Sequence, residues 1–229
     1  MNVTFYQVGG SLRDEFLGVK SKDIDYAVEA PSFTAMREAI VERGGKIFLE
    51  TPQYLTIRAM VPDLGAADFV LCRKDSAYRD GRHPDSVEIG TIFDDLARRD
   101  FTMNAMARNV LTNKLIDPHC GYEDICSRVV RCVGNPVDRF NEDKLRILRA
   151  LRFVATKKMN LLWHTSEAIL KFPLDSFAVV STERIREELL KMFAADSEWA
   201  FHQLFVHFPV LGDLALQRGI WFKPTLESV

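Results

Sequence analysis

The first 70 residues alternate between the two-residue period of β-strands and the longer period of amphipathic helices, which limits the folds open to this chain. Glycine pairs and other turn formers separate the segments. This alternation predicts helices packed on a mixed sheet rather than a β-sandwich. Strands are expected at residues 3–8, 23–28, 46–50, 54–61 and 67–73, and helices at residues 12–18 and 32–45.

The pattern changes in the middle of the chain. Residues 73–91 are rich in turn formers and lack apolar periodicity, so we expect a long mobile loop there. A helix at 93–108 and the end of a strand at 114–118 should follow. From Phe140 onward only helices are expected, at 142–157, 164–172 and 181–193, which places a domain boundary near Pro136.

Composition excludes several classes of protein. The chain of 229 residues is 47% hydrophobic and 27% charged, as in globular proteins of one or two domains. No apolar run approaches the roughly 18 residues that span a bilayer, and the N-terminus lacks the features of a signal peptide, so a cytoplasmic location is expected. The cysteines form no C-x-x-C pair, which favours reduced thiols in a packed interior over a zinc site or disulfides.

The formal net charge of −2 argues against a protein that coats itself with nucleic acid. The charge is nevertheless uneven. Residues 144–158 contain six basic side chains and no acidic one, so a local binding site for a polyanion is possible.

Two aspartates stand on one face of an expected strand. Side chains at alternate positions of a strand point the same way, so Asp23 and Asp25 in KDIDYAV should lie side by side. Like charges at that spacing repel each other. Either water screens them at an exposed edge, or a cation lies between them.

A Gly-Gly turn, Gly9–Gly10, precedes Arg13 in VGGSLRDEFLG. Glycines let backbone N–H groups approach a ligand, a helix start favours an anion, and arginine binds phosphate oxygens. No Walker motif follows, and such turns are common. Together with the paired aspartates, however, this phosphate cradle suits metal-dependent phosphoryl or nucleotidyl transfer.

Five ordered segments resemble the motifs of bacterial-type (class II) tRNA nucleotidyltransferases, the CCA-adding enzymes, and of the related poly(A) polymerases. They are GGSLRDEFLG with KDIDYAV, YRDGRHPDSVEIGTIFDDLARRDFTMNAMA, IDPHCGYEDI, RFNEDKLRILRALRF and STERIREELL. The resemblance implies an α+β fold. A nucleotidyltransferase-type head with a mixed β-sheet and helices would occupy residues 1–137. An all-α neck for base selection and RNA binding would occupy 138–229, with the body and tail of full-length members largely absent.

The reaction that the resemblance implies is template-independent addition of C and A to the 3′ end of tRNA, from CTP and ATP. The RNA 3′-hydroxyl would attack the α-phosphate, and pyrophosphate would leave. Asp23 and Asp25 would hold two Mg²⁺ ions. Asp68 is the candidate third carboxylate, although it could equally be a strand-end cap.

Further residues would bind the nucleotide. The resemblance makes Arg99 and Asp100 contacts for the triphosphate and a ribose hydroxyl, with Asn104 expected on the same helical face as Asp100. Asp143 and Arg146 lie three apart on an expected helix. The family assigns such a pair to reading the base edge, whereas the residues alone fit an ordinary surface ion pair. Arg149 would reach the base or the phosphates.

Several alternatives stay open. Poly(A) polymerases typically carry a basic Gly-Arg-Arg-Phe segment where this chain has GGKIFLE. Enzymes that add only CC lack a flexible loop that resemblance identifies with YRDGRHPD here, which favours full CCA addition. A catalytically silent RNA- or nucleotide-binding remnant is a third possibility, and the retained aspartates argue against it. STERIREELL should brace the neck rather than perform chemistry.

Overall fold

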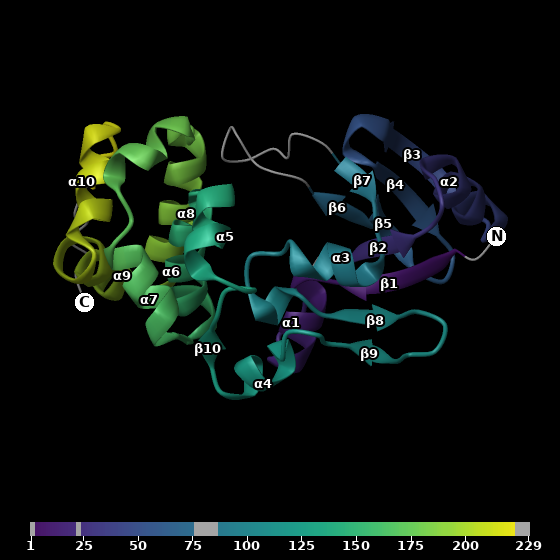
Figure 1. Ribbon diagram of the computed structural model, residues 1–229, viewed down its shortest axis with the longest axis horizontal. Coiled ribbons are helices and arrows are strands. Elements are labelled where there is room, and N and C mark those ends of the chain that lie inside the picture. Colours follow the sequence, from purple (N-terminus) through teal and green to yellow (C-terminus); the bar gives the residue numbers. More distant parts are fainter. Residues whose placement is uncertain (1–2, 22–23, 76–86, 223–229) are drawn as a thin grey trace, which may run out of the picture. The chain divides into compact units, whose positions relative to one another are not determined.

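The computed structural model describes residues 3–21, 24–75 and 87–222, which form two compact units (Figure 1). The first unit ends at Asn135 and the second starts at Pro136. Asp23 and most of the expected mobile loop lie outside the described residues.

The first unit alternates strands and helices, as the sequence predicts. Its elements are β1 Thr4–Val8, α1 Gly10–Phe16, β2 Asp25–Glu29, α2 Phe33–Glu42, β3 Lys46–Thr51, η1 Pro52–Tyr54, β4 Thr56–Val61, β5 Gly65–Leu71, β6 Arg73–Asp75, β7 Val87–Ile89, α3 Ile92–Ala97, η2 Thr102–Asn104, β8 Ala107–Asn109, β9 Leu115–Ile116, α4 Gly121–Cys126 and β10 Val129–Val130.

The main sheet of the described residues has the strand order β3-β4-β5-β2-β1-β8-β9. Strands β2 and β5 pair in parallel, and the other neighbours are antiparallel. Each face of the sheet has its own core. On one face α2 packs Met36 and Ile40 against strand residues such as Phe69. On the other, α3 packs Ile92 and Leu96 against residues such as Tyr6 and Ala27.

Local signals account for most of these elements. Ser32 starts α2 because its side chain accepts a hydrogen bond from the backbone N–H of Ala35 at 3.0 Å. Apolar residues at every second position of β5 fill the core beside α2, so Asp68 between them faces the other way. The α+β class expected from the sequence is confirmed.

The helix expected at 93–108 is wrong beyond Ala97. Residues 100–102 pair instead with residues 131–133: Thr102 donates its backbone N–H to Arg131, and Val133 donates to Asp100. Phe101 is fully buried. These distant partners take the backbone groups that a helix would use. The ends of the polar middle segment also differ from expectation, since β6 and β7 pair as antiparallel strands.

A buried carboxylate organises the end of α3. Asp95 is only 1% exposed, and its two oxygens accept hydrogen bonds from Arg98 (Nη2, 2.6 Å) and Arg99 (Nη2, 3.0 Å). Burial alone would raise the pKa of Asp95, but the guanidinium groups of Arg99 and Arg98 outweigh it and hold that pKa below its usual value. The carboxylate therefore stays ionised and fixes both arginines.

In the described residues of the second unit, the regular elements are helices apart from β11 Asn160–Leu161. Its helices are α5 Pro136–Glu142, α6 Leu145–Lys157, α7 Trp163–Leu170, η3 Leu174–Val179, α8 Thr182–Ala195, α9 Ser197–His202, the π-helical segment η4 Gln203–His207 and α10 Pro209–Gln217.

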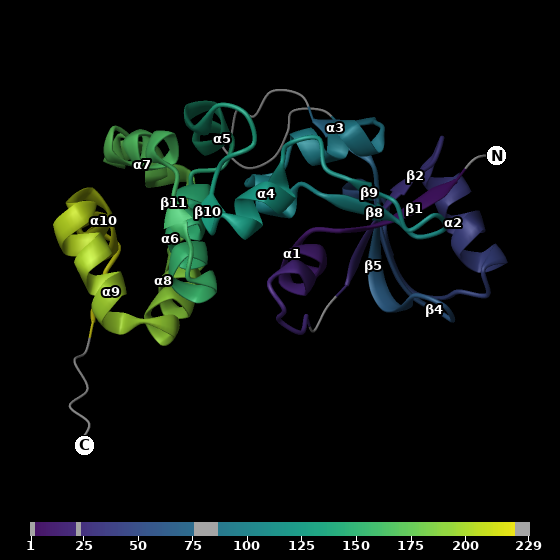
Figure 2. The same cartoon turned by 90° about the horizontal axis from the view of Figure 1, so that it is seen from below.

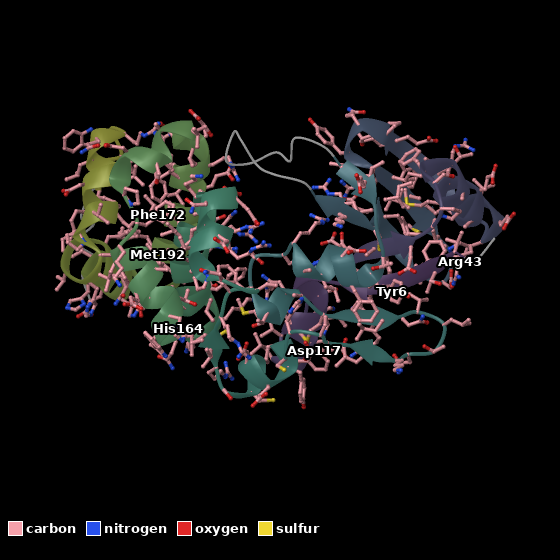
Figure 3. All side chains as sticks on the ribbon, in the orientation of Figure 1. Tyr6, Arg43, Asp117, His164, Phe172 and Met192 are labelled. Atoms are coloured by element: carbon pink, nitrogen blue, oxygen red, sulfur yellow. The ribbon has the colours of Figure 1, made fainter. Side chains whose placement is uncertain are left out.

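Helices α6 and α8 lie side by side in this unit (Figure 2). An ion pair between Arg152 Nε and Glu188 Oε2, 2.6 Å apart, joins them. Phe172 and Met192, labelled in Figure 3, are among the buried apolar side chains of the core.

Two further expectations from the sequence concern membrane-spanning helices and the burial of the cysteines. Among the described residues, no helix combines the length and apolar character needed to cross a bilayer. Cys72 and Cys132 are buried as expected, whereas Cys120 and Cys126 are exposed, so the expectation of interior thiols is wrong for this second pair.

Replacing Asp95 with Asn should destabilise the first unit, because it leaves two arginines without the buried anion between them. We expect the free energy of unfolding in urea at pH 7 to fall by about 3 kcal/mol. Because the folded-state pKa is lowered, this stabilisation is present above the unfolded-state value of 3.8 and is lost as the pH falls through the folded-state pKa. The difference between variant and parent should therefore narrow in acid.

The matched control is Asp94→Asn, one residue earlier in α3, where the half-buried side chain accepts hydrogen bonds from the backbone N–H (2.8 Å) and hydroxyl (2.7 Å) of Thr91, which an asparagine oxygen can also accept. This change removes a charge from the helix start and should cost about 0.5 kcal/mol. Equal losses in the two variants would contradict the role of Asp95.

Candidate active site

Two carboxylates lie side by side on one face of the main sheet. Asp25 is the register partner of Asp68 across the parallel strands β2 and β5, and of Val8 across the antiparallel strands β1 and β2. Paired residues on adjacent strands, about 4.8 Å apart, share a face. The structure thus brings the candidate third carboxylate next to Asp25, whereas the role of Asp23 lies outside the described residues.

Both described carboxylates are accessible to a ligand. Asp25 is exposed, and the side chain of Asp68 is 41% exposed. Carboxylate oxygens are the ligands that Mg²⁺ prefers, so this pair fits such an ion chemically. Within the described ranges no group of three or more His, Cys, Asp or Glu side chains is placed to hold a metal.

The Gly-Gly turn begins directly after Val8, next to these carboxylates. Gly9 has a φ of +73°, which favours glycine, and a Cβ there would lie 3.0 Å from Arg99 Nη1. A Cβ on Gly10 would lie 3.3 Å from Arg13 Nη2. The glycines therefore make room for two guanidinium groups. Helix α1 has seven residues, so these arginines, more than the helix start, supply the positive charge.

Arg13 begins a chain of buried polar contacts. Its Nη1 donates to Asn104 Oδ1 at 2.7 Å, and Asn104 Nδ2 donates to Asp100 Oδ1 at 3.0 Å. Asp14 holds the other side of Arg13, accepting from Nε at 2.9 Å. Arg13, Asn104 and Asp100 are each less than a tenth exposed. Asp100 and Asn104 are close as predicted, although a turn and η2, not one helix, bring them together.

Arg99 is fixed in the same cluster. Its Nη1 donates to the backbone oxygen of Asn104 at 3.2 Å, while Nε and Nη2 bind Asp95. The structure thus gathers six of the predicted nucleotide-binding residues. They are Gly9, Gly10, Arg13, Arg99, Asp100 and Asn104, and we call them the arginine cluster.

The segment IDPHCGYEDI, residues 116–125, packs against η2. Asp117, labelled in Figure 3, accepts hydrogen bonds from the backbone N–H groups of Gly121 (2.7 Å) and Tyr122 (2.9 Å). A Cβ on Gly121 would lie only 2.1 Å from the carbonyl oxygen of Thr102. The Thr102 hydroxyl donates to the buried carboxylate of Asp124. These contacts fix the turn that carries Asn104.

Four aspartates of this site, Asp14, Asp95, Asp117 and Asp124, have no role that the sequence predicted. Only Asp117 carried a local signal, because an aspartate four residues before a glycine at a helix start can accept backbone hydrogen bonds. The partners of Asp124 lie 7 and 22 residues away, at Arg131 and Thr102.

The predicted base-reading residues lie in the second unit. Asp143 is not within a helix with Arg146, as the sequence predicted, but in the break between α5 and α6. Its Oδ1 accepts from the backbone N–H of Leu145 at 3.0 Å, and this competing hydrogen bond explains the break. Its Oδ2 accepts from Arg184 Nη2 at 3.0 Å.

Arg146 has a different partner. Its Nη1 donates to Glu142 Oε2 at 2.7 Å and to the backbone oxygen of Arg139 at 3.3 Å. Arg149 lies further along α6, with its guanidinium carbon 5.8 Å from the centre of the Phe153 ring. The two predicted base readers are thus each oriented by a neighbouring charge, Arg184 for Asp143 and Glu142 for Arg146.

Comparison with known proteins identifies the family and the relatives that this chain resembles. Residues 5–131 match the family model described as the poly A polymerase head domain. A CCA-adding enzyme of Lactobacillus helveticus is 33% identical and aligns with 97% of this chain and 57% of its own length. One from Enterococcus faecalis is 36% identical, over 82% of this chain and 44% of its own.

Solved structures of CCA-adding enzymes also resemble this chain. The Bacillus stearothermophilus CCA-adding enzyme in complex with CTP is 29% identical, with a TM-score of 0.75 over 92% of this chain and 51% of that one. The Thermotoga maritima CCA-adding enzyme complexed with tRNA is 25% identical, with a TM-score of 0.68 over 97% and 50%. The chain spans about half the length of the curated relatives it matches. It belongs to the poly A polymerase head domain family, the family of these CCA-adding enzymes.

Proposed function

We propose that this chain is a tRNA nucleotidyltransferase that adds C and A to the 3′ end of tRNA, from CTP and ATP, and releases pyrophosphate. The observation that carries the proposal is the register of Asp25 with Asp68 beside the arginine cluster. Residues 1–137 would form the catalytic head and residues 138–229 the neck. The relatives that bind CTP or tRNA support this assignment.

In the head, the chain's own residues bind and orient the nucleotide. Arg13 and Arg99 hold positive charge where the triphosphate would lie, and Asp14 and Asp95 keep those guanidinium groups in place. Asp100 is suited to accept a hydrogen bond from a ribose hydroxyl. Asp23 and Asp25, with Asp68, would hold two Mg²⁺ ions, which lower the pKa of the attacking hydroxyl and neutralise the leaving pyrophosphate.

In the neck, Asp143 and Arg146 would select the base. A carboxylate only accepts hydrogen bonds and a guanidinium only donates them. Cytosine presents an amino donor beside a ring acceptor, and so does adenine, whereas guanine and uracil present the opposite order. One Asp–Arg pair can therefore accept C and A and reject G and U. Arg149 would assist at the base or the phosphates.

The first test is incorporation of labelled nucleotides by the purified chain onto a tRNA transcript that lacks its 3′ CCA. CTP and ATP should be incorporated in the presence of Mg²⁺, and GTP and UTP should not. Extension of an unrelated oligomer with A alone would support the poly(A) polymerase alternative. The match of residues 5–131 to the poly A polymerase head domain is the observation that favours this alternative. Addition of C without A would indicate a CC-adding enzyme, and no incorporation a silent binding protein.

Replacing Asp25 with Asn should abolish incorporation without unfolding the head, because the change removes one charge from a pair that already repels. Urea unfolding should show a free energy equal to that of the parent or slightly higher. Asp63→Asn is the matched control, since Asp63 is an exposed carboxylate paired with Arg43 and away from the site. Full activity in the Asp25 variant would overturn its catalytic role.

Replacing Arg184 with Gln should weaken base selection, because Asp143 loses the side chain that holds its Oδ2. We expect the KM values for CTP and ATP to rise about tenfold and discrimination against UTP to narrow, with a stability loss of about 1.5 kcal/mol. Arg186→Gln, a change at an exposed position of the same helix, is the control. Unchanged discrimination in the Arg184 variant would show that Asp143 needs no such support.

A further inference from the structure

The row of paired residues that contains the two carboxylates continues across the sheet. Arg58 on β4 is the register partner of Asp68, and Leu49 on β3 is the partner of Arg58. At one height the sheet therefore presents Val8, Asp25, Asp68 and Arg58 in that order, on one face. Arg58 flanks the carboxylates on the side opposite the Gly-Gly turn.

The ion pair between Arg58 and Asp68 is weak. Arg58 Nε lies 3.7 Å from Asp68 Oδ1, beyond hydrogen-bond distance, and the Arg58 side chain is 62% exposed. Exposed pairs of this kind contribute about 0–1 kcal/mol to stability. The fold therefore gains little from an arginine at this position, and its guanidinium is accessible to an anionic ligand.

The surface around Arg58 is open and carries no acidic residue on β3 or β4. On this face Lys46 pairs with Met60, Leu49 with Arg58, and Thr51 with Thr56. Leu49 and Met60 are 57% and 44% exposed. Glu50 pairs with Ile57, which belongs to the core beside α2, so it faces the other way. We call Lys46, Leu49, Arg58 and Met60 the β3–β4 strip.

The geometry of nucleotidyl transfer assigns an occupant to this strip. In phosphoryl transfer the attacking oxygen and the leaving group lie roughly in line on opposite sides of the phosphorus. The arginine cluster, which would hold the leaving pyrophosphate, adjoins β1 on one side of the carboxylates. The attacking RNA 3′-hydroxyl must then arrive from the other side, where β5 and β4 lie.

We propose that Arg58 binds the last phosphodiester of the RNA primer, with the β3–β4 strip as the surface on which the 3′-terminal nucleotides lie. This inference rests on the proposed function and extends it to the second substrate. Guanidinium groups bind phosphate oxygens in a bidentate manner, and exposed apolar side chains pack against sugars and bases. An arginine beside Asp68 thus positions the primer and not the incoming nucleotide.

The test compares Arg58→Gln with Arg37→Gln in the full chain. Arg37 is also an exposed arginine paired with a carboxylate, Glu50, at 3.0 Å, but it lies on α2 at the opposite face of the sheet. Binding of a fluorescein-labelled tRNA transcript lacking CCA is measured by anisotropy over a range of salt concentrations. Steady-state kinetics give separate KM values for this RNA and for CTP.

Arg58→Gln should raise the Kd and the KM for RNA about tenfold and leave the KM for CTP within about twofold, as expected from loss of one phosphate contact. The slope of log K against log salt should fall in magnitude by about 0.7, the value for one phosphate of a single strand. Arg58→Lys should restore the slope. Arg37→Gln should match the parent in every measurement, and urea unfolding should show that both variants are folded.

Three results would overturn the inference: RNA affinity and salt slope equal to those of Arg37→Gln, a raised KM for CTP with an unchanged Kd for RNA, or an altered Mg²⁺ requirement with normal RNA binding. The last two would assign Arg58 to the nucleotide or to Asp68. The binding measurements do not depend on turnover. A chain that incorporates no nucleotide would refute the proposed function, while the salt slopes would still decide the role of Arg58.

Discussion

The parallel pairing of β2 with β5 is the constraint on which the site depends. Between these strands the chain passes through α2, β3 and β4, so β5 returns beside β2 in the same direction and β4 comes to lie on its far side. This crossover puts Asp68 next to Asp25. A slip of one residue in β5 would turn Asp68 into the core and Phe69 toward solvent, so the burial of Phe69 fixes the carboxylate pair.

Near this pair of carboxylates lie two arginines, each of which is paired with another carboxylate. Arg13 and Arg99 occupy the space that side chains on Gly9 and Gly10 would need, and each is held by a carboxylate of its own, Asp14 or Asp95. Fixed guanidinium groups bind a phosphate without first losing rotamer freedom, which is the physical basis of preorganisation. The buried acidic residues behind the arginines would therefore contribute to the proposed triphosphate site without touching the anion.

The sequence predicted local features well and distant ones poorly. The strand periods and the Ser32 helix start depend on neighbours in the chain. The end of α3 at Ala97 depends on pairing with residues 131–133, about 30 positions away, which overrides the helical pattern. The burial of Asp95 was likewise hidden, because in a sequence it looks like one more charge on a solvated turn.

The break between α5 and α6 bears on how the proposed base-reading pair, Asp143 and Arg146, would move. Arg146 belongs to α6, and its direction changes only when that helix turns as a body. Asp143 precedes the helix, so rotation about a few backbone bonds at the junction changes its position relative to Arg146. In the proposed base selection, the distance between the Asp143 carboxylate and the Arg146 guanidinium would therefore be adjustable. If both residues lay within one continuous helix, the distance between them would be fixed and would suit a base of one size only.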